Sequence, residues 1–188
     1  MSIFLIACPW AIPCKEEEKI DKETKDYCLF GEESYWLYQD SATLKIDSVV
    51  IDNPISHKFL LEEAESCDYS TEIFAIKGSF FSYDSTFFFH VRLLPSSTAV
   101  LSDDGFITYY HNGQIGEGFG TKLKEKRNNY LINGIVFNNI KIFEYYHLGH
   151  KEIYYWAKHV GLIRMEIYEN DTVIVRNLIK YNVKPYNQ

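Results

Sequence analysis

The feature that most constrains the fold is a period-two alternation of apolar and polar side chains, which starts near Tyr27 and continues almost to the end of the chain. The apolar positions hold mainly Tyr, Phe, Ile and Val, which favour β-strands. Gly, Asn and Asp separate these runs at intervals of about ten residues, as expected of turns. Because alternation places successive side chains on opposite faces of a strand, the pattern predicts a β-sheet with a buried face.

Strands are predicted at residues 35–38, 45–51, 74–81, 86–94, 99–101, 106–110, 130–136, 140–146, 152–159, 162–168 and 172–183. No strongly amphipathic helix lies between them, which disfavours a parallel βαβ arrangement. The sequence therefore predicts a mainly β fold, a single antiparallel domain of about ten strands with at most one or two short helices. Its strands can form a barrel, a half-barrel or a sandwich. Residues 57–65 fit either a helical stripe or a strand.

The sharpest change in composition comes near the N-terminus. Residues 1–14 contain no charged side chain, whereas residues 15–26 contain ten in twelve. The first stretch is too short to span a bilayer, which takes about 20 residues, but it matches the end of a signal-peptide apolar region. The second has one apolar residue, Ile20, so it has no face to bury even if it forms a helix. We therefore predict a leader at 1–14, a solvated charged tether at 15–26 and an antiparallel β domain at 27–188.

Leu5-Ile6-Ala7-Cys8 has the form of a lipobox, in which a small residue precedes the cysteine that becomes lipidated. Cys8 is therefore the predicted lipid anchor, and Cys14, directly before the charged run, is the alternative. A positively charged segment before the apolar stretch is missing, which favours a start codon upstream of Met1. The competing interpretation is that residues 3–6 form an ordinary buried strand of a cytosolic β protein without a leader.

Charge argues against one class of partner. The formal net charge of −7 opposes contact with phosphate backbones, which requires clustered Lys and Arg. We expect no nucleic-acid partner. One basic run, residues 122–127, follows a glycine-rich segment at 113–120 that matches no phosphate-binding loop pattern. A flexible hairpin loop leading to a solvated basic turn is the favoured interpretation, and contact with an acidic partner or a membrane is the alternative.

Three stretches resemble uncharacterised secreted lipoproteins of the bacterial cell envelope. Residues 30–41 read FGEESYWLYQDS, residues 154–164 read YYWAKHVGLIR, and residues 178–184 read LIKYNVK. The resemblance implies a mostly β envelope domain, lipid-anchored at the outer membrane or facing the periplasm, with no assigned reaction. It supplies no catalytic residues to transfer.

The motif residues also have direct physical interpretations. Trp36 and Trp156 are predicted core anchors whose indole N–H groups need acceptors, with an exposed aromatic platform for a ligand as the alternative. Gly161 is predicted to occupy a bulge or tight bend, because glycine inside a strand pattern marks an unusual φ or a close backbone approach.

Candidate chemistry is sparse. Cys28 and Cys67 are candidates for a disulfide, which in an oxidising compartment would contribute roughly 4 kcal/mol. His147, His150 and His159 are weak candidates for metal ligands, against the alternative of an exposed polar turn. Signatures of serine hydrolases are absent, no histidine is spaced to activate a cysteine, and no cofactor is expected.

These observations favour an exported lipoprotein that acts as a non-catalytic module in the cell envelope and binds an unknown ligand or partner protein. The alternative is an envelope hydrolase or isomerase with a dispersed active site. A cleft in which His147, His150 or His159 meets a carboxylate or a serine would support that alternative.

Overall fold

A computed structural model of the chain describes residues 15–20, 22–64, 67–81, 86–93, 98–102, 105–109, 121–147 and 150–186. Residues 1–14, and with them the predicted anchors Cys8 and Cys14, lie outside the described residues. So does the predicted glycine-rich loop at 113–120.

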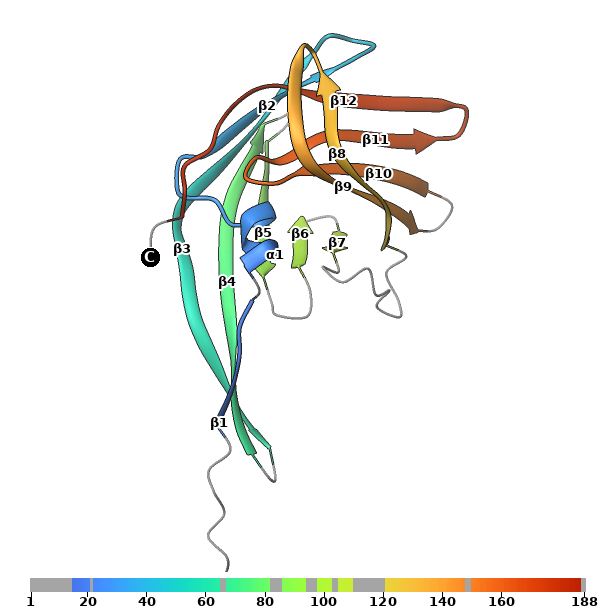
Figure 1. Ribbon diagram of the computed structural model, residues 1–188. Helices are drawn as coiled ribbons and strands as arrows, with labels where there is room; N and C mark the ends of the chain where they lie inside the picture. The colour runs from blue at the N-terminus through green and yellow to red at the C-terminus, as the bar shows by residue number, and fades with distance from the viewer. Residues whose placement is uncertain are drawn as a thin grey trace, which may run out of the picture.

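One curved sheet dominates the molecule, and the one helix among the described residues, α1 (Lys22–Cys28), packs beside it (Figure 1). The strands are β1 (Lys15–Glu18), β2 (Tyr35–Asp40), β3 (Ile46–Ala64), β4 (Cys67–Phe81), β5 (Thr86–Leu93), β6 (Thr98–Ser102), β7 (Gly105–Tyr109), β8 (Thr121–Ile132), β9 (Ile135–His147), β10 (His150–Ala157), β11 (Gly161–Glu169) and β12 (Thr172–Asn182). The spatial order is β7-β6-β5-β4-β3-β2-β12-β11-β10-β9-β8.

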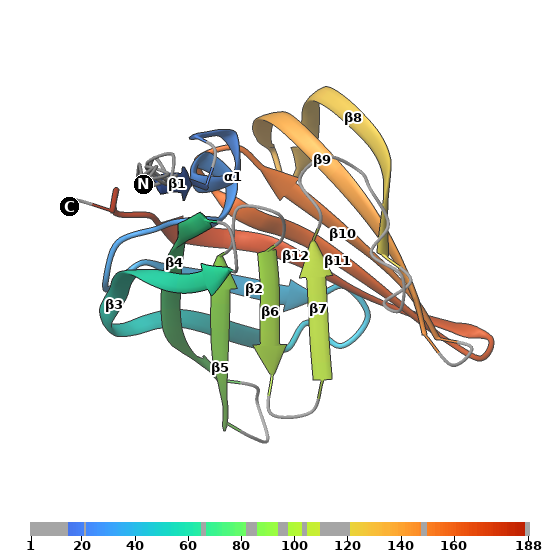
Figure 2. The same ribbon diagram turned by 90° about the horizontal axis from the view of Figure 1, so that it is seen from below.

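The sheet is open. Every pair along this order is antiparallel, β7 and β8 form its two edges, and no ladder joins these edges among the described strands (Figure 2). The predicted mainly β, antiparallel fold with few helices is confirmed, and a closed barrel does not fit. The ambiguous residues 57–65 lie, up to Ala64, in strand β3. The exception to antiparallel pairing is β1, which runs parallel to β4.

The burial of Ile20 contradicts the predicted solvated tether at this position, whereas Lys19, Lys22 and Glu23 of the same segment are exposed. Strand β1 and helix α1 lie against the sheet, and Ile20 between them is only 3% exposed. The backbone N–H of Ile20 donates to Oε2 of Glu72 on β4 at 2.9 Å, and Lys25 of α1 donates to Oε1 of the same carboxylate at 2.9 Å. The physical reason is that Glu72 supplies a buried acceptor for this segment, which no local pattern reveals.

The motif stretches at 30–41, 154–164 and 178–184 pack into one unit. Trp36 is buried, and its indole N–H donates to the carbonyl of Val160 at 2.6 Å. The Phe30 ring meets the Trp36 ring edge-on at 5.3 Å between centroids. Gly31 donates its N–H to the carbonyl of Lys184 at 2.7 Å, which ties the first stretch to the third. Trp36 is therefore a core anchor, as predicted.

Gly161 ends the turn between β10 and β11. Its φ is +93°, in the region that L side chains rarely adopt, and a Cβ placed there would lie 3.0 Å from Cε2 of Phe30. The predicted tight bend is confirmed. The register of β10 against β11 also shifts between Tyr155 and Trp156, so the turn follows an irregularity in the ladder. Trp156 itself is half-buried.

Candidate functional site

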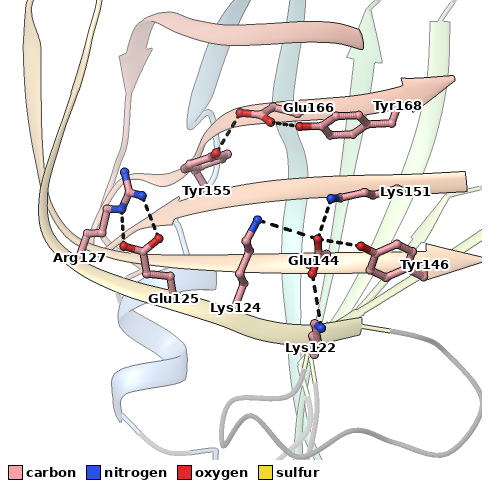
Figure 3. Close-up of polar contacts among 10 residues, drawn as sticks. All are labelled: Lys122, Lys124, Glu125, Arg127, Glu144, Tyr146, Lys151, Tyr155, Glu166 and Tyr168. Carbon is pink, nitrogen blue, oxygen red and sulfur yellow. Dashed lines mark hydrogen bonds and ion pairs between the residues drawn. The ribbon is translucent and has the colours of Figure 1, made fainter. Parts of the chain in front are cut away.

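A charged and aromatic cluster crosses one face of β8, β9 and β10 (Figure 3). The Glu144 cluster, as we name it, consists of Lys122, Lys124, Glu144, Tyr146 and Lys151. Register explains why these residues meet: Lys122 lies opposite Glu144, and Lys151 lies opposite Tyr146. Partners directly opposite each other point to the same face of the sheet.

At the centre of the cluster is the Glu144 carboxylate, which is only 5% exposed. Lys151 Nζ lies 3.0 Å and Lys124 Nζ 3.9 Å from Oε1, and Lys122 Nζ lies 3.5 Å from Oε2. The Tyr146 hydroxyl also donates to Oε1, at 3.0 Å. Burial of Glu144 opposes its ionisation, but hydrogen bonds from Lys151 and Tyr146 outweigh that effect and hold the pKa of Glu144 below its ordinary value. The carboxylate is therefore a fixed negative charge.

A second buried carboxylate, Glu166 on β11, lies beside this cluster. It accepts hydrogen bonds from the Tyr155 hydroxyl at 2.9 Å, the Arg164 Nε at 2.8 Å and the Tyr168 hydroxyl at 2.8 Å. Lys151 Nζ links the two carboxylates, because it lies 5.0 Å from the centroid of the Tyr168 ring. With three donors on its two oxygens, Glu166 is a structural anion of this face.

The polar groups of this face are joined by ion pairs and hydrogen bonds. Burial and the hydrogen bond to Glu166 raise the pKa of the Tyr155 hydroxyl, so this phenol stays neutral. Both carboxylates remain ionised because donors surround them. The hydroxyls that contact these two carboxylates belong to tyrosines, and neither carboxylate has a histidine, serine or threonine side chain among the contacts that the structure gives it, so the arrangement does not form a serine–histidine type of nucleophile–base pair.

A cavity of about 480 Å³ lies between α1 and the C-terminal end of the chain. The lining of this α1 cavity includes four charged or titratable residues, Lys22, Lys25, Asp26 and His159. The other lining residues are apolar or aromatic, and they are Leu29, Phe30, Val183, Pro185 and Tyr186. Its volume is in the range of small-molecule sites, roughly 300–1,000 Å³.

Asp26 forms ion pairs with neighbouring charged residues. Its carboxylate lies 2.9 Å from Lys22 Nζ, 3.2 Å from Lys158 Nζ and 3.7 Å from His159 Nδ1. Burial of Asp26 opposes its ionisation, yet hydrogen bonds from Lys22 and Lys158 keep its pKa below the ordinary value. The His159 side chain is 66% exposed, and its backbone N–H donates to the Asp26 carbonyl at 2.7 Å. The lining of the cavity thus combines paired charges with apolar side chains.

Comparison with known proteins places the fold. No family model matches the chain, and no curated protein matches it. A solved structure from Bacteroides fragilis, of a protein inferred to be exported and with a YmcC-like fold, matches with a TM-score of 0.53 at 9% identity, over 83% of this chain and 98% of that one. The chain has the fold of this protein. A second structure, of a protein from Parabacteroides distasonis inferred to be a lipoprotein, gives a TM-score of 0.48 at 11% identity over 81% of this chain and 97% of that one.

The resemblance to exported envelope proteins that the sequence motifs predict is therefore confirmed at the level of the fold. In the described part of the chain, no helix is long and apolar enough to cross a membrane.

The three predicted metal-ligand histidines do not form one site. The backbones of His147 and His150 pair at the β9–β10 hairpin, whereas His159 lies beyond the opposite end of β10. A strand of eight residues spans about 26 Å, so His159 cannot approach the other two. The side chains of His147 and His150 lie outside the described residues, and the rest of the described chain holds no group of three potential metal ligands.

The tryptophans and cysteines that the sequence singled out lie in different surroundings. Trp36 is buried with its N–H bonded, so it offers no exposed platform, while Trp156 is half-buried. Cys28 is half-buried at the end of α1. The side chain of Cys67 lies outside the described residues, so the Cys28–Cys67 disulfide stays a prediction.

Sequence reasoning missed both the Glu144 cluster and the α1 cavity. The basic run at 122–127 was expected in a solvated turn, but it lies in edge strand β8, where two of its lysines reach Glu144. The alternation of Lys122 and Lys124 with Leu123 was an available signal of a strand. The cavity had no local signal, because its lining residues come from 22–30, 159 and 183–186, which are far apart in the sequence.

Proposed function

We propose that this chain is an exported, lipid-anchored protein of the bacterial cell envelope that works as a non-catalytic binding module. The fold shared with the exported Bacteroides fragilis protein supports an envelope location. The lipobox at Leu5-Ile6-Ala7-Cys8 supports attachment to the membrane through Cys8, with Cys14 as the alternative.

The observation that carries the binding role is the α1 cavity. Its apolar lining residues suit a hydrocarbon or ring, and its charged lining residues suit a polar end group, because buried polar groups need partners whereas apolar surface gains by leaving water. We therefore propose a small amphiphilic ligand whose polar end lies against α1 and whose apolar part lies against Val183 and Tyr186.

Decanoate is a suitable probe, with binding measured by isothermal titration calorimetry. Val183→Trp should fill the cavity and abolish binding. Val173→Trp is the matched control, because Val173 is exposed on β12 and does not line the cavity. Binding in the wild type and the control, with loss in Val183→Trp, supports the proposal. Equal binding in both variants would place the ligand elsewhere and overturn this site.

Metabolic labelling with tritiated palmitate tests the anchor. Labelling that disappears in Cys8→Ala identifies Cys8 as the anchor, whereas loss only in Cys14→Ala moves the anchor to Cys14. A wild-type protein that takes up no label would contradict the lipid-anchored part of the proposal and leave the cavity untouched.

One observation favours the alternative of an envelope hydrolase: His159 and Asp26 meet on the wall of the α1 cavity. Against it, 3.7 Å is longer than a hydrogen bond, and Lys22 and Lys158 hold the Asp26 carboxylate. The lining residues of this cavity include no serine, threonine or cysteine. Hydrolysis of p-nitrophenyl esters that is lost in His159→Asn would favour the hydrolase, and activity that survives the substitution would exclude His159 from that role.

A further inference from the structure

The Glu144 cluster carries more positive charge than its carboxylate balances. Three ammonium groups, on Lys122, Lys124 and Lys151, lie within 4 Å of Glu144. In the described chain, Glu144 is the one carboxylate that lies this close to them. One negative charge against three positive charges leaves an excess of two.

The lysines are held close together and remain accessible. Lys151 and Lys124 contact the same oxygen, at 3.0 and 3.9 Å, so their Nζ atoms lie within about 7 Å of each other, inside the screening length of physiological salt. The side chains of Lys122 and Lys124 are 52% and 44% exposed. The buried carboxylate thus gathers cations that would otherwise repel one another, and it leaves their outer sides open to solvent.

Protection of a sheet edge explains only part of this arrangement. Lysines on an edge strand such as β8 prevent pairing with other chains. Lys151, however, lies on β10, which is an interior strand, and it makes the shortest of the three contacts. Neutralising Glu144 would take one lysine. Neither role accounts for three lysines from two strands around one carboxylate.

We propose that the Glu144 cluster binds a phosphomonoester group. Such a group carries about −1.5 to −2 charges at neutral pH, which matches the excess charge of the cluster, and its oxygens accept hydrogen bonds from several ammonium groups at once. The exposed ring of Tyr146 lies beside Lys151, with Nζ 5.7 Å from the ring centroid, and offers a surface for the organic part of the ligand. The ligand is either a soluble phosphorylated molecule or a phosphorylated lipid headgroup.

Two probes distinguish these sources. Glycerol phosphate, followed by isothermal titration calorimetry, represents the soluble source. Vesicles that contain phosphatidic acid, followed by co-sedimentation, represent the lipid headgroup. Vesicles of phosphatidylglycerol with matched surface charge are the control, because their phosphate is a diester. Binding to either phosphomonoester probe in preference to phosphatidylglycerol supports the proposal.

The test variant is Lys122→Ala combined with Lys124→Ala. Removing two lysines near an anionic group should weaken binding about 30-fold. The matched control is Lys126→Ala combined with Lys180→Ala. Lys126 lies opposite Lys141, whose side chain contacts Glu23 of α1, so it belongs to the other face of the sheet. Lys180 is exposed on β12. All four side chains are solvent-exposed, so circular dichroism should show that both variants fold.

A further readout is pH. Binding of the dianion should weaken as the pH falls through about 6, the second pKa of a phosphomonoester. Three outcomes would overturn the proposal: no binding of any probe by the wild type, equal binding to phosphatidic acid and phosphatidylglycerol, or an equal loss of affinity in the test and control variants. Each of them leaves the α1 cavity unaffected, since that cavity includes none of these residues.

Discussion

Replacing Ile20 by alanine should lower the free energy of unfolding by about 3 kcal/mol. Ile20 is 3% exposed and belongs to the main core cluster of the molecule. The substitution removes three carbon atoms, each worth about 0.8 kcal/mol in transfer from water, and leaves a cavity that adds to the loss. A residue in a solvated tether would instead contribute within about 0.5 kcal/mol.

Urea denaturation followed by tryptophan fluorescence measures this difference. With a slope of about 2 kcal/mol per molar urea, a loss of 3 kcal/mol lowers the midpoint by about 1.5 M. Ile46→Ala is the matched control, because Ile46 undergoes the same chemical change but is 51% exposed. Its midpoint should stay within about 0.5 M of the wild type.

Equal midpoints for the two variants would refute the reasoning. In that case Ile20 would not be packed in solution, and the segment before α1 would be the solvated tether that its composition predicts. A midpoint lowered only in Ile20→Ala would show that residues before Tyr27 belong to the folded domain.

Other substitutions test particular contacts. Gly161→Ala should cost about 1–3 kcal/mol in thermal unfolding, because φ is +93° and the new methyl group would press on Phe30; an unchanged melting temperature would show that the turn relaxes. Trp36→Phe should cost about 1–3 kcal/mol, since the Val160 carbonyl loses its donor, and chemical denaturation would reveal a smaller loss if water replaces the indole. Burial of Glu166 opposes its ionisation, but hydrogen bonds, first of all from Tyr168, hold its pKa below the ordinary value of 4.5. The ionised Glu166 therefore stabilises the folded state above that pH, and this contribution is lost as the pH falls through the lowered pKa. Melting curves between neutral and acidic pH should therefore show a weaker pH dependence in Glu166→Gln than in the wild type, and identical slopes would contradict this role.

Several strands were predictable because the signal for a strand is local, although the strand predicted at 130–136 is wrong, since the β8–β9 turn at Asn133 and Gly134 interrupts it. Runs such as 162–168 and 172–183 alternate apolar and polar residues, and they form β11 and β12 with nearly the predicted bounds. Gly161 was predictable for the same reason: a residue without Cβ serves a positive φ wherever it lies. The role of Trp36 as a core anchor was predictable from its size and from the need of its indole N–H for an acceptor.

The candidate sites were not predictable, because each depends on distant pairings. Lys122, Glu144 and Lys151 meet only when β8, β9 and β10 pair in their particular register. A shift of one residue in the β8–β9 ladder would turn Lys122 to the other face and remove it from Glu144. The histidines show the reverse case, since residues close in sequence lie at opposite ends of β10.

The sequence by itself determined that the chain forms a mainly β, antiparallel fold, that it bends at Gly161 and that Trp36 is a core anchor, because burial with a period of two and backbone preference are local properties. Only the tertiary structure decided that the sheet stays open and that residues 15–28 pack against it. The decisive contact is a hydrogen bond from Ile20 to Glu72, fifty-two residues away, whose partner does not exist until the sheet has formed. Composition predicted a solvated tether, and a buried carboxylate on β4 made this segment part of the fold.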